Sequence, residues 1–120
     1  YQKCLHSEEV ELFGSGKETR DFIYINDLVH AIDCVIKNGL FNGEAVNIAS
    51  GLETEIKNAA TIFINEKNPS IKLKFNMIVK PGDPLHWRAD IDLLKSFGFT
   101  NQVSIEEGLK NVVKWLKENK

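Results

Sequence analysis

The sequence predicts a mixed α/β fold, with its elements in the chain order β-β-α-β-α-β-α-α. Short runs rich in β-branched and aromatic residues, such as 19–25 and 71–77, alternate with segments whose apolar residues recur every three to four positions. Glycine, proline and asparagine stand between these segments, where turns are expected. The pattern indicates a small domain in which strands and helices bury their apolar faces together.

The length and composition favour a single soluble domain. The chain has 120 residues, of which 42% are hydrophobic and 27% charged. A net charge of −2 offers no basic surface to nucleic acid or anionic lipid, and no apolar run is long enough to cross a membrane. Cys4 and Cys34 form no C-x-x-C pair, which favours a reducing, cytoplasmic location. Because the chain begins without Met, we expect a piece of a longer protein.

The first elements are predicted to form a hairpin. Residues 9–14 have β character and lead into the glycine-rich turn 14–17, where glycines supply the backbone freedom for a reversal. Residues 19–25 follow, with the uninterrupted apolar run Phe-Ile-Tyr-Ile. Such a run favours a strand that is covered on both faces.

The middle of the chain is predicted to alternate helix and strand. Asn26 or Asp27 is expected to cap a helix that ends before Gly39. Residues 44–50 are predicted to form a short strand, and Thr54 is expected to cap the next helix. The expected inward faces are Leu28, Ala31, Ile32, Val35 and Ile36 in the first helix and Ile56, Ala59, Ala60 and Phe63 in the second.

The last part of the chain is predicted to contain a strand, a loop and two helices. Residues 71–77 alternate strictly between apolar and polar, so this strand should have one wet face. Two prolines place residues 80–84 in a loop, and Asp90 is expected to cap a short helix. Ser104 and Glu107 form a capping box. The final helix should bury Leu109, Val112, Val113 and Leu116.

The sequence lacks the familiar nucleotide and metal motifs. No G-x-G-x-x-G segment follows a predicted strand, so no dinucleotide loop is encoded. The stretch GSGKE, residues 14–18, lacks the Walker spacing and is expected to be a bend rather than a phosphate cradle. His6, His30 and His86 show no metal-ligand spacing with each other or with the cysteines, and no nucleophile motif is present. We therefore expect no catalytic residue and no metal site.

Charged residues at strand ends and in loops are the remaining candidates: Arg20, Lys80, Asp83 and Arg88. Arg20 opens a predicted strand, so its guanidinium should be held near a rigid sheet, where a fixed planar donor group suits phosphate. The alternative is structural, with Arg20 paired to Asp21 at the rim of the sheet. The residues alone leave both alternatives open.

Four segments follow one another in an order that is typical of one enzyme family. FGSGKETRDFIYINDLVHAI is similar to a GDG-x-x-x-RDF-x-x-V-x-D segment, and GEAVNIASGLETEIKNAA to G-x-x-Y-N-I-G-S-G-x-x-x-S-I. KPGDPLHWRADIDLLKSFGF is similar to R-x-G-D…A-D-x-x-K-x-x-x-L-G, and SIEEGLKNVVKWLKEN to a closing S-L-E-E-G-L helix. Together they resemble the extended short-chain dehydrogenase/reductases, the NAD-dependent epimerases and dehydratases typified by UDP-glucose 4-epimerase.

The resemblance implies which part of such an enzyme the chain represents. In the family, an N-terminal Rossmann portion binds NAD or NADP and carries the Tyr-x-x-x-Lys pair that transfers hydride and proton. The chain contains no Tyr-x-x-x-Lys. It therefore resembles the C-terminal, substrate-binding domain, residues 1–120. The resemblance implies NAD or NADP in the parent protein, no cofactor bound by this fragment, and no turnover by the fragment alone.

The resemblance also implies substrate-binding residues. Arg20 matches the arginine that relatives use on the diphosphate of a nucleotide sugar, and Asp83 matches an acid that reaches the ribose or base. Lys80 stands where the family has an arginine, so it keeps the charge and loses the planar fork. Glu11 and Phe13 fall in a segment that relatives place against the base. Trp87 falls where relatives line the sugar pocket; packing of its ring under the loop is the alternative.

Two functions follow as hypotheses. The first is the substrate domain of a nucleotide-sugar epimerase, dehydratase or reductase, with a UDP-sugar as the expected ligand and the missing Rossmann domain as the expected partner. The second is a non-catalytic nucleotide-binding or protein-interaction module that retains the fold. We also expect the apolar residues that would face the missing domain to be exposed at the cut surface, with homo-oligomer formation as a consequence.

Overall fold

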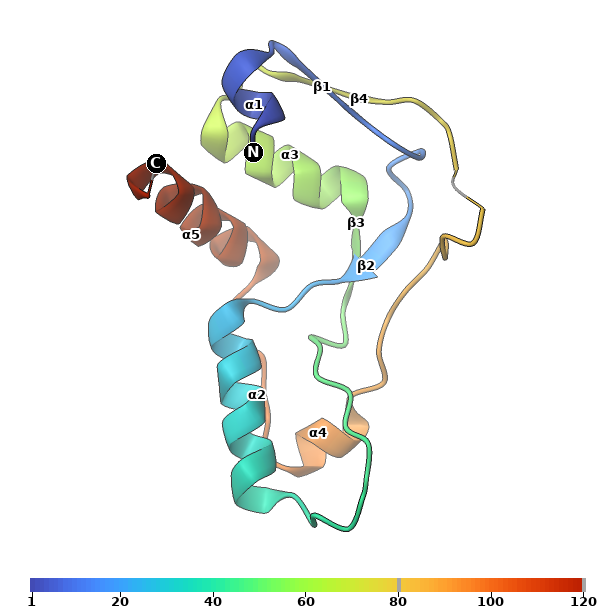
Figure 1. Cartoon of the computed structure of the whole chain (residues 1–120), viewed down its shortest axis with the longest axis vertical. Helices are drawn as coiled ribbons and strands as arrows, with labels where there is room; N and C mark the ends of the chain where they lie inside the picture. The colour runs from blue at the N-terminus through green and yellow to red at the C-terminus, as the bar shows by residue number, and fades with distance from the viewer. Residues whose placement is uncertain (80, 120) are drawn as a thin grey trace.

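The computed structural model describes residues 1–79 and 81–119. Figure 1 shows an elongated molecule in which short strands connect two groups of helices. The elements in chain order are α1 (Lys3–His6), β1 (Glu9–Leu12), β2 (Thr19–Asp21), α2 (Ile25–Asn38), β3 (Glu53–Glu55), α3 (Ile56–Lys67), β4 (Lys72–Phe75), α4 (Asp92–Ser96) and α5 (Ile105–Glu118). The mixed α/β class is confirmed.

One part of the molecule is built on the parallel pair of β1 and β4. Glu9 to Leu12 lie opposite Lys72 to Phe75, and α3 packs beside both the pair and α5 (Figure 1). The buried residues of this part are Val10, Ile64 and Ile71. Burial alternates along β4 as predicted, because Lys72 and Lys74 face water while the residues between and after them are half-buried.

The other part is built on α2 and α4. Its buried cluster joins α2 to the residues around α4 and to one residue of the 44–50 segment: Ala31, Cys34, Ala49, Ile91, Leu94, Phe97 and Phe99. Phe99 and Leu94 are almost completely buried. Between the two parts, β2 and β3 pair antiparallel, with Arg20 opposite Thr54 (Figure 1).

The predicted hairpin of the first two strands is wrong. β1 pairs with β4 and β2 pairs with β3, so the two segments leave the turn in different sheets. The predicted strand 19–25 is also shorter, since β2 ends at Asp21 and α2 begins at Ile25. Phe22 is 39% exposed, so this run is not covered on both faces. A short apolar run does not by itself determine how deeply its residues are buried, because distant segments decide which strand pairs with it.

Residues 44–50 were predicted to be a strand, and the structure assigns none there. Their burial nevertheless alternates, with Val46 and Ile48 half-buried between the exposed Ala45 and Asn47. Within residues 1–79 and 81–119, no strand pairs with this segment. A segment with strand-like side chains is therefore left without the neighbour that a ladder requires.

The helix ends show where local capping rules succeeded. Ser104 caps α5, because its hydroxyl accepts a hydrogen bond from the Glu107 amide, and α2 ends at Gly39 as predicted. The predicted cap of α3 is wrong, since Thr54 lies in β3 and Glu55 is the N-cap residue. The predicted cap of α4 is also wrong, since Ile91 is the N-cap residue; the Asp90 carboxylate accepts from the Asp92 amide one position earlier.

Asp27 does not cap α2. Tyr24 is the N-cap residue, and the buried Asp27 carboxylate accepts hydrogen bonds from the amides of Gln102 and Val103. The acid therefore ties the start of α2 to the segment that enters α5. Charge-assisted bonds of this kind stabilise a buried carboxylate that would otherwise be costly.

α2 is apolar on two opposite sides. The buried side consists of Asp27, Ala31 and Cys34, whereas Ile32 and Ile36, predicted to face inward, are 43% and 64% exposed. The exposed apolar residues lie on one face at helical spacing: Ile25, Val29, Ile32 and Ile36. We call these four residues the α2 stripe. None of the helices within residues 1–79 and 81–119 combines the length and apolar character that membrane crossing requires.

Candidate functional site

Arg20 lies on β2, and its side chain contacts the loop 81–91, which is the last part of the segment between β4 and α4. Its Nη1 donates to the carbonyl oxygens of Thr19 at 2.7 Å and Pro84 at 2.9 Å. Its Nη2 lies 3.6 Å from a carboxylate oxygen of Asp83. The side chain retains 24% exposure. The guanidinium is therefore oriented by backbone groups and still reaches solvent, which is the arrangement expected of an anion-binding arginine.

The alternative in which Arg20 pairs with Asp21 does not describe this structure. The Asp21 carboxylate accepts from the Ser50 amide at 2.8 Å, the Ser50 hydroxyl at 2.6 Å, the Gly51 amide at 3.0 Å and the Ala89 amide at 3.2 Å. These bonds hold residues 50–51 and the end of the 81–91 loop against β2. Asp21 thus fixes the surroundings of Arg20 without neutralising it.

Arg20 and Asp83 line a pocket with a volume of about 290 Å³, called here the first pocket. Its other walls include the apolar side chains of Phe13, Ile78, Val79 and Leu85. The pocket lies where the chain leaves β1 and where it leaves β4. Two acids also line this mainly apolar pocket: Asp83, which faces Arg20, and Glu18, whose carboxylate is held by backbone amides. An open apolar pocket with one arginine at its edge suits a flat, partly polar ligand whose negative charge lies beside that arginine.

Arg20 also lines a second pocket, with a volume of about 380 Å³. Its lining includes Asp21, Asn47, Ala49 and Trp87. The Arg20 guanidinium carbon is 5.8 Å from the centre of the Trp87 ring, within the range of a cation–π contact. Trp87 is 58% exposed, so packing of its ring under the loop is excluded. Arg20 therefore belongs to both pockets.

The remaining predicted site residues have different outcomes. Phe13, Arg20 and Asp83 come together in the first pocket, and Trp87 joins Arg20 in the second. Glu11 is exposed on β1, lies opposite Lys74 and lines neither pocket. Lys80 lies outside the described residues.

The glycine-rich turn is closed by its own acid. The Glu18 carboxylate accepts from the Ser15 amide at 2.9 Å and the Gly16 amide at 2.8 Å. These amide bonds, that of Ser15 first, lower the pKa of Glu18 below its ordinary value of 4.5. The positive backbone angles of Gly14 and Gly16 permit this shape. A carboxylate thus occupies the amides that a phosphate cradle would need, consistent with the predicted bend.

The histidines and cysteines are dispersed. His30 lies 3.7 Å from the Cys34 sulfur and packs against Phe99. Within residues 1–79 and 81–119, no three His, Cys, Asp or Glu side chains gather as a metal site would require. Both cysteines are free thiols.

Thr19 was missed by the sequence analysis. It is 7% exposed, and its hydroxyl lies 3.0 Å from Glu53 Oε1 and 3.3 Å from His86 Nδ1. Its backbone amide donates to the Leu85 carbonyl at 2.9 Å. No sequence motif identifies a threonine that joins three segments. The one available signal was His86, which lies in an irregular loop beside the candidate charged residues.

Comparison with known proteins identifies the family. Residues 1–49 match the NAD dependent epimerase/dehydratase family. The chain is 32% identical over 120 residues to the putative UDP-glucose 4-epimerase of Methanocaldococcus jannaschii, a match that covers 98% of this chain and 37% of that protein. It is also 32% identical over 118 residues to the putative GDP-L-fucose synthase 2 of Arabidopsis thaliana, covering 98% and 35%.

The fold is shared with solved members of the same group. UDP-glucose 4-epimerase from Thermotoga maritima, determined with UDP-glucose, superposes with a TM-score of 0.84 at 27% identity. The match covers 98% of this chain and 37% of that one. The chain thus spans well under half the length of the relatives it matches. Over that part of their length, the chain belongs to the NAD-dependent epimerase/dehydratase family of extended short-chain dehydrogenase/reductases.

Proposed function

We propose that this chain is the substrate-binding part of a nucleotide-sugar epimerase, dehydratase or reductase, and that Arg20 binds the diphosphate of the substrate. The observation that carries the proposal is that Arg20, whose guanidinium is oriented by backbone carbonyls, lines both pockets. A nucleotide sugar has the matching order of groups, with a base and ribose on one side of a diphosphate and a sugar on the other. The solved relative that was determined with UDP-glucose supports this ligand class.

The energetics favour exchange of the partner of Arg20 on binding. The Arg20 to Asp83 contact is long, at 3.6 Å, and the Asp83 side chain is 54% exposed. An exposed ion pair of this kind contributes at most about 1 kcal/mol, whereas a charge-assisted hydrogen bond to phosphate contributes about 1.5–3 kcal/mol. A diphosphate therefore competes successfully for the guanidinium. Asp83 then becomes free to accept hydrogen bonds from ribose hydroxyls.

The two pockets divide the ligand by polarity. Phe13, Val79 and Leu85 give the first pocket apolar walls that suit the face of a base. Asn47 and Asp21 give the second pocket polar groups near Trp87, which suit a sugar with its hydroxyls and apolar ring face. We propose this assignment of base and sugar for a UDP-sugar in particular.

The residues present do not fit the dinucleotide cofactor. The glycine-rich turn of the chain carries the Glu18 carboxylate on its amides, where a pyrophosphate would be repelled. Nor does a G-x-G-x-x-G segment occur in the sequence. We propose that NAD or NADP is bound by a further, Rossmann-type portion of the parent protein. The contribution of this chain is to hold the substrate in position, which is one of the larger sources of enzymatic rate enhancement.

Titration with UDP-glucose tests the proposal. In a two-dimensional NMR spectrum of the labelled chain, signals of Phe13, Arg20, Asp83 and Trp87 should move as the ligand reaches millimolar concentration. Arg20→Gln should weaken binding about ten- to hundredfold, the equivalent of one charge-assisted hydrogen bond. Arg88→Gln is the matched control. Arg88 is an exposed arginine of the loop 81–91, which Arg20 contacts, and it lines neither pocket.

Two results would contradict the proposal. Signals that stay still at saturating ligand would remove the nucleotide-sugar site. Equal losses of affinity in Arg20→Gln and Arg88→Gln would show that the total positive charge of this region matters and the position of Arg20 does not. A folded spectrum of each variant is the condition for the comparison.

A further inference from the structure

The loop that carries Trp87 is attached to β2 through Thr19. The Thr19 amide donates to the Leu85 carbonyl at 2.9 Å, and the Trp87 amide reaches the Thr19 hydroxyl at 3.4 Å. The neighbouring Arg20 donates to the Pro84 carbonyl. Successive loop residues are therefore bound by two adjacent residues of one strand. The Trp87 ring is 58% exposed, and it is held by these backbone attachments together with the Arg20 guanidinium, which lies 5.8 Å from the ring centre.

The Thr19 hydroxyl also joins His86 to Glu53. The hydroxyl is 3.0 Å from Glu53 Oε1 and 3.3 Å from His86 Nδ1, and the imidazole nitrogen is 4.0 Å from the same carboxylate oxygen. A hydroxyl has one proton to donate, and the carboxylate can only accept. When Thr19 donates to Glu53, its oxygen is left to accept from His86 Nδ1 and from the Trp87 amide. The network is then complete only if His86 carries a hydrogen on Nδ1.

We propose that Thr19, His86 and Glu53 form a clip that positions Trp87 against Arg20 and thereby sets the shape of the second pocket. Thr19 is a positioning residue in this role, because it acts on the pocket through the loop. The use of the clip in sugar binding rests on the proposed function, whereas its effect on Trp87 does not.

Protonation strengthens the clip. Imidazolium always carries a hydrogen on Nδ1, and its charge is attracted by Glu53. The described charged groups on β2, on β3 and on the loop 81–91 are Arg20, Asp21, Glu53, Glu55, Asp83, Arg88 and Asp90. Arg20 contacts Asp83 and donates to a backbone carbonyl. Glu53 lies within ion-pair distance of His86, so its carboxylate is the charge that acts most directly on the imidazole.

The fluorescence of Trp87 tests the clip directly. Trp115→Phe leaves Trp87 as the single tryptophan of the chain, and collisional quenching by acrylamide then reports how firmly the ring is held. In this background Thr19→Val removes the hydroxyl and keeps the branched shape. We expect the population of released loop to rise roughly two- to tenfold, the effect of losing one ordinary hydrogen bond, with a matching rise in quenching. Thr19→Ser restores the hydroxyl and should restore the parental quenching.

Variants at His86 separate position from charge. His86→Asn keeps a hydrogen-bond donor near the place of Nδ1 and carries no charge, so quenching should stay as low as in the parent if the hydrogen bond is sufficient. His86→Ala removes the donor and should behave as Thr19→Val does. The His86 side chain is 63% exposed, so these variants keep the folded core even where a change at the buried Thr19 does not.

Two outcomes would overturn the clip: quenching in Thr19→Val and His86→Ala equal to that of the parent, or quenching in His86→Asn equal to that in His86→Ala. A UDP-glucose titration of the same variants is read separately. Weaker binding in Thr19→Val than in Thr19→Ser supports the role of the clip in sugar binding. Absence of binding in the parent, with the quenching differences retained, contradicts the proposed function and leaves the clip standing.

Discussion

At the scale of single residues, carboxylates and not cations organise the surroundings of Arg20. Asp21 binds three backbone amides from two distant segments, and Glu18 binds the amides of the preceding turn. Arg20 is left with backbone carbonyls and a long contact to Asp83. Acids thus provide the rigidity, and the arginine keeps the capacity to bind an anion.

Removal of the Asp21 charge should destabilise the fold. Asp21→Asn replaces a carboxylate that accepts four hydrogen bonds with an amide that presents one oxygen. We expect a loss of about 1.5–3 kcal/mol in the free energy of unfolding, measured by urea denaturation. Asp33→Asn is the control, because its exposed pair with Lys37 contributes under about 1 kcal/mol. Equal losses in the two variants would contradict the structural role of Asp21.

The stability of the chain should fall in acid, in part through Glu18. Amide hydrogen bonds hold its pKa below 4.5 in the folded chain, so the unfolded chain binds the proton more readily. The stabilisation is therefore complete above about pH 4.5 and is lost as the pH falls through the lowered pKa. Glu44 is a second case, since the amides of Leu40, Phe41 and Asn42 lower its pKa.

The measurement is a comparison of Glu18→Gln with the parent chain across pH. The difference in free energy of unfolding should be largest at neutral pH and should shrink below pH 4.5, where the parent acid also becomes neutral. Glu8→Gln provides a control at an exposed acid outside the turn. A difference that does not change with pH would show that the Glu18 charge contributes nothing.

At the scale of elements, the turn between β1 and β2 depends on close packing as well as on glycine. Gly16 has a φ angle of 83°, and a Cβ built on it would lie 2.7 Å from the Phe75 ring at the end of β4. Gly43 has a similar φ angle of 92° and open space around it. Both glycines therefore need a positive φ angle, but only Gly16 has a neighbouring side chain that an added Cβ would meet.

The comparison of Gly16→Ala with Gly43→Ala isolates that contact. Each alanine should cost about 1–2 kcal/mol for its left-handed backbone. Gly16→Ala should cost about 1–3 kcal/mol more, because Phe75 must move away from the added methyl group. Thermal unfolding of the two variants gives the difference. Equal melting temperatures would mean that Phe75 moves away from the added methyl group without cost.

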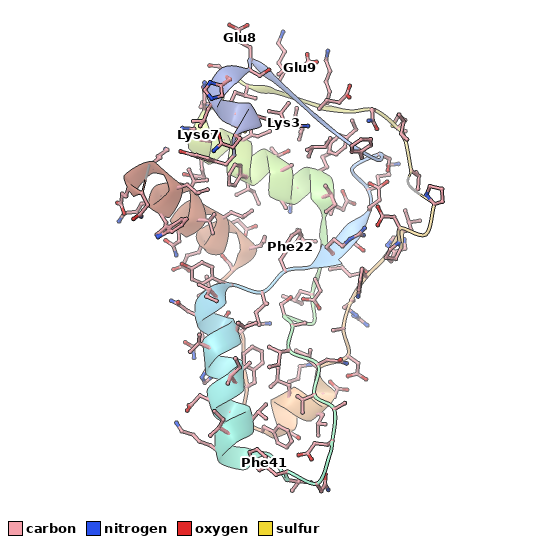
Figure 2. All side chains as sticks on the ribbon, in the orientation of Figure 1. Lys3, Glu8, Glu9, Phe22, Phe41 and Lys67 are labelled. Carbon is pink, nitrogen blue, oxygen red and sulfur yellow. The ribbon has the colours of Figure 1, made fainter. Side chains whose placement is uncertain are left out.

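At the scale of the whole molecule, the shape is extended and one face of α2 is both apolar and exposed. The radius of gyration is 16.7 Å, against about 13–14 Å for a compact domain of this length. The α2 stripe lies opposite the buried side of its helix, and Leu40 and Phe41 continue it with more than 70% exposure. Figure 2 shows Phe41 at the end of the molecule, beyond α2. A helix that is apolar on both sides is normally buried.

We propose that the Rossmann-type portion of the parent covers this surface, and that the chain alone self-associates through it. Light scattering should give a mass above that of one chain at high concentration. Val29→Lys with Ile36→Lys should shift the mass toward the monomer, because each change places a charge in the α2 stripe. Asn111→Lys, an exposed change on α5, should leave the mass unaltered. A parent chain that stays monomeric would contradict the proposal.

The sequence by itself determined the parts of this protein that depend on neighbouring residues. The alternation along residues 71–75, the serine cap of α5 and the glycine after α2 act within a few residues, so composition and spacing were sufficient to predict them. The four family segments, read in order, also led to the correct family.

Only the tertiary structure decided the partners. β1 pairs with β4 across some sixty residues of chain and not with β2, and Asp21 and Asp27 bind amides that no local pattern connects with them. Arg20 could have paired with Asp21 or faced Asp83, and the folded backbone selected Asp83. Hydrogen-bond partners distant in sequence are fixed by where the packed elements bring the chain together, and no local preference contains that information.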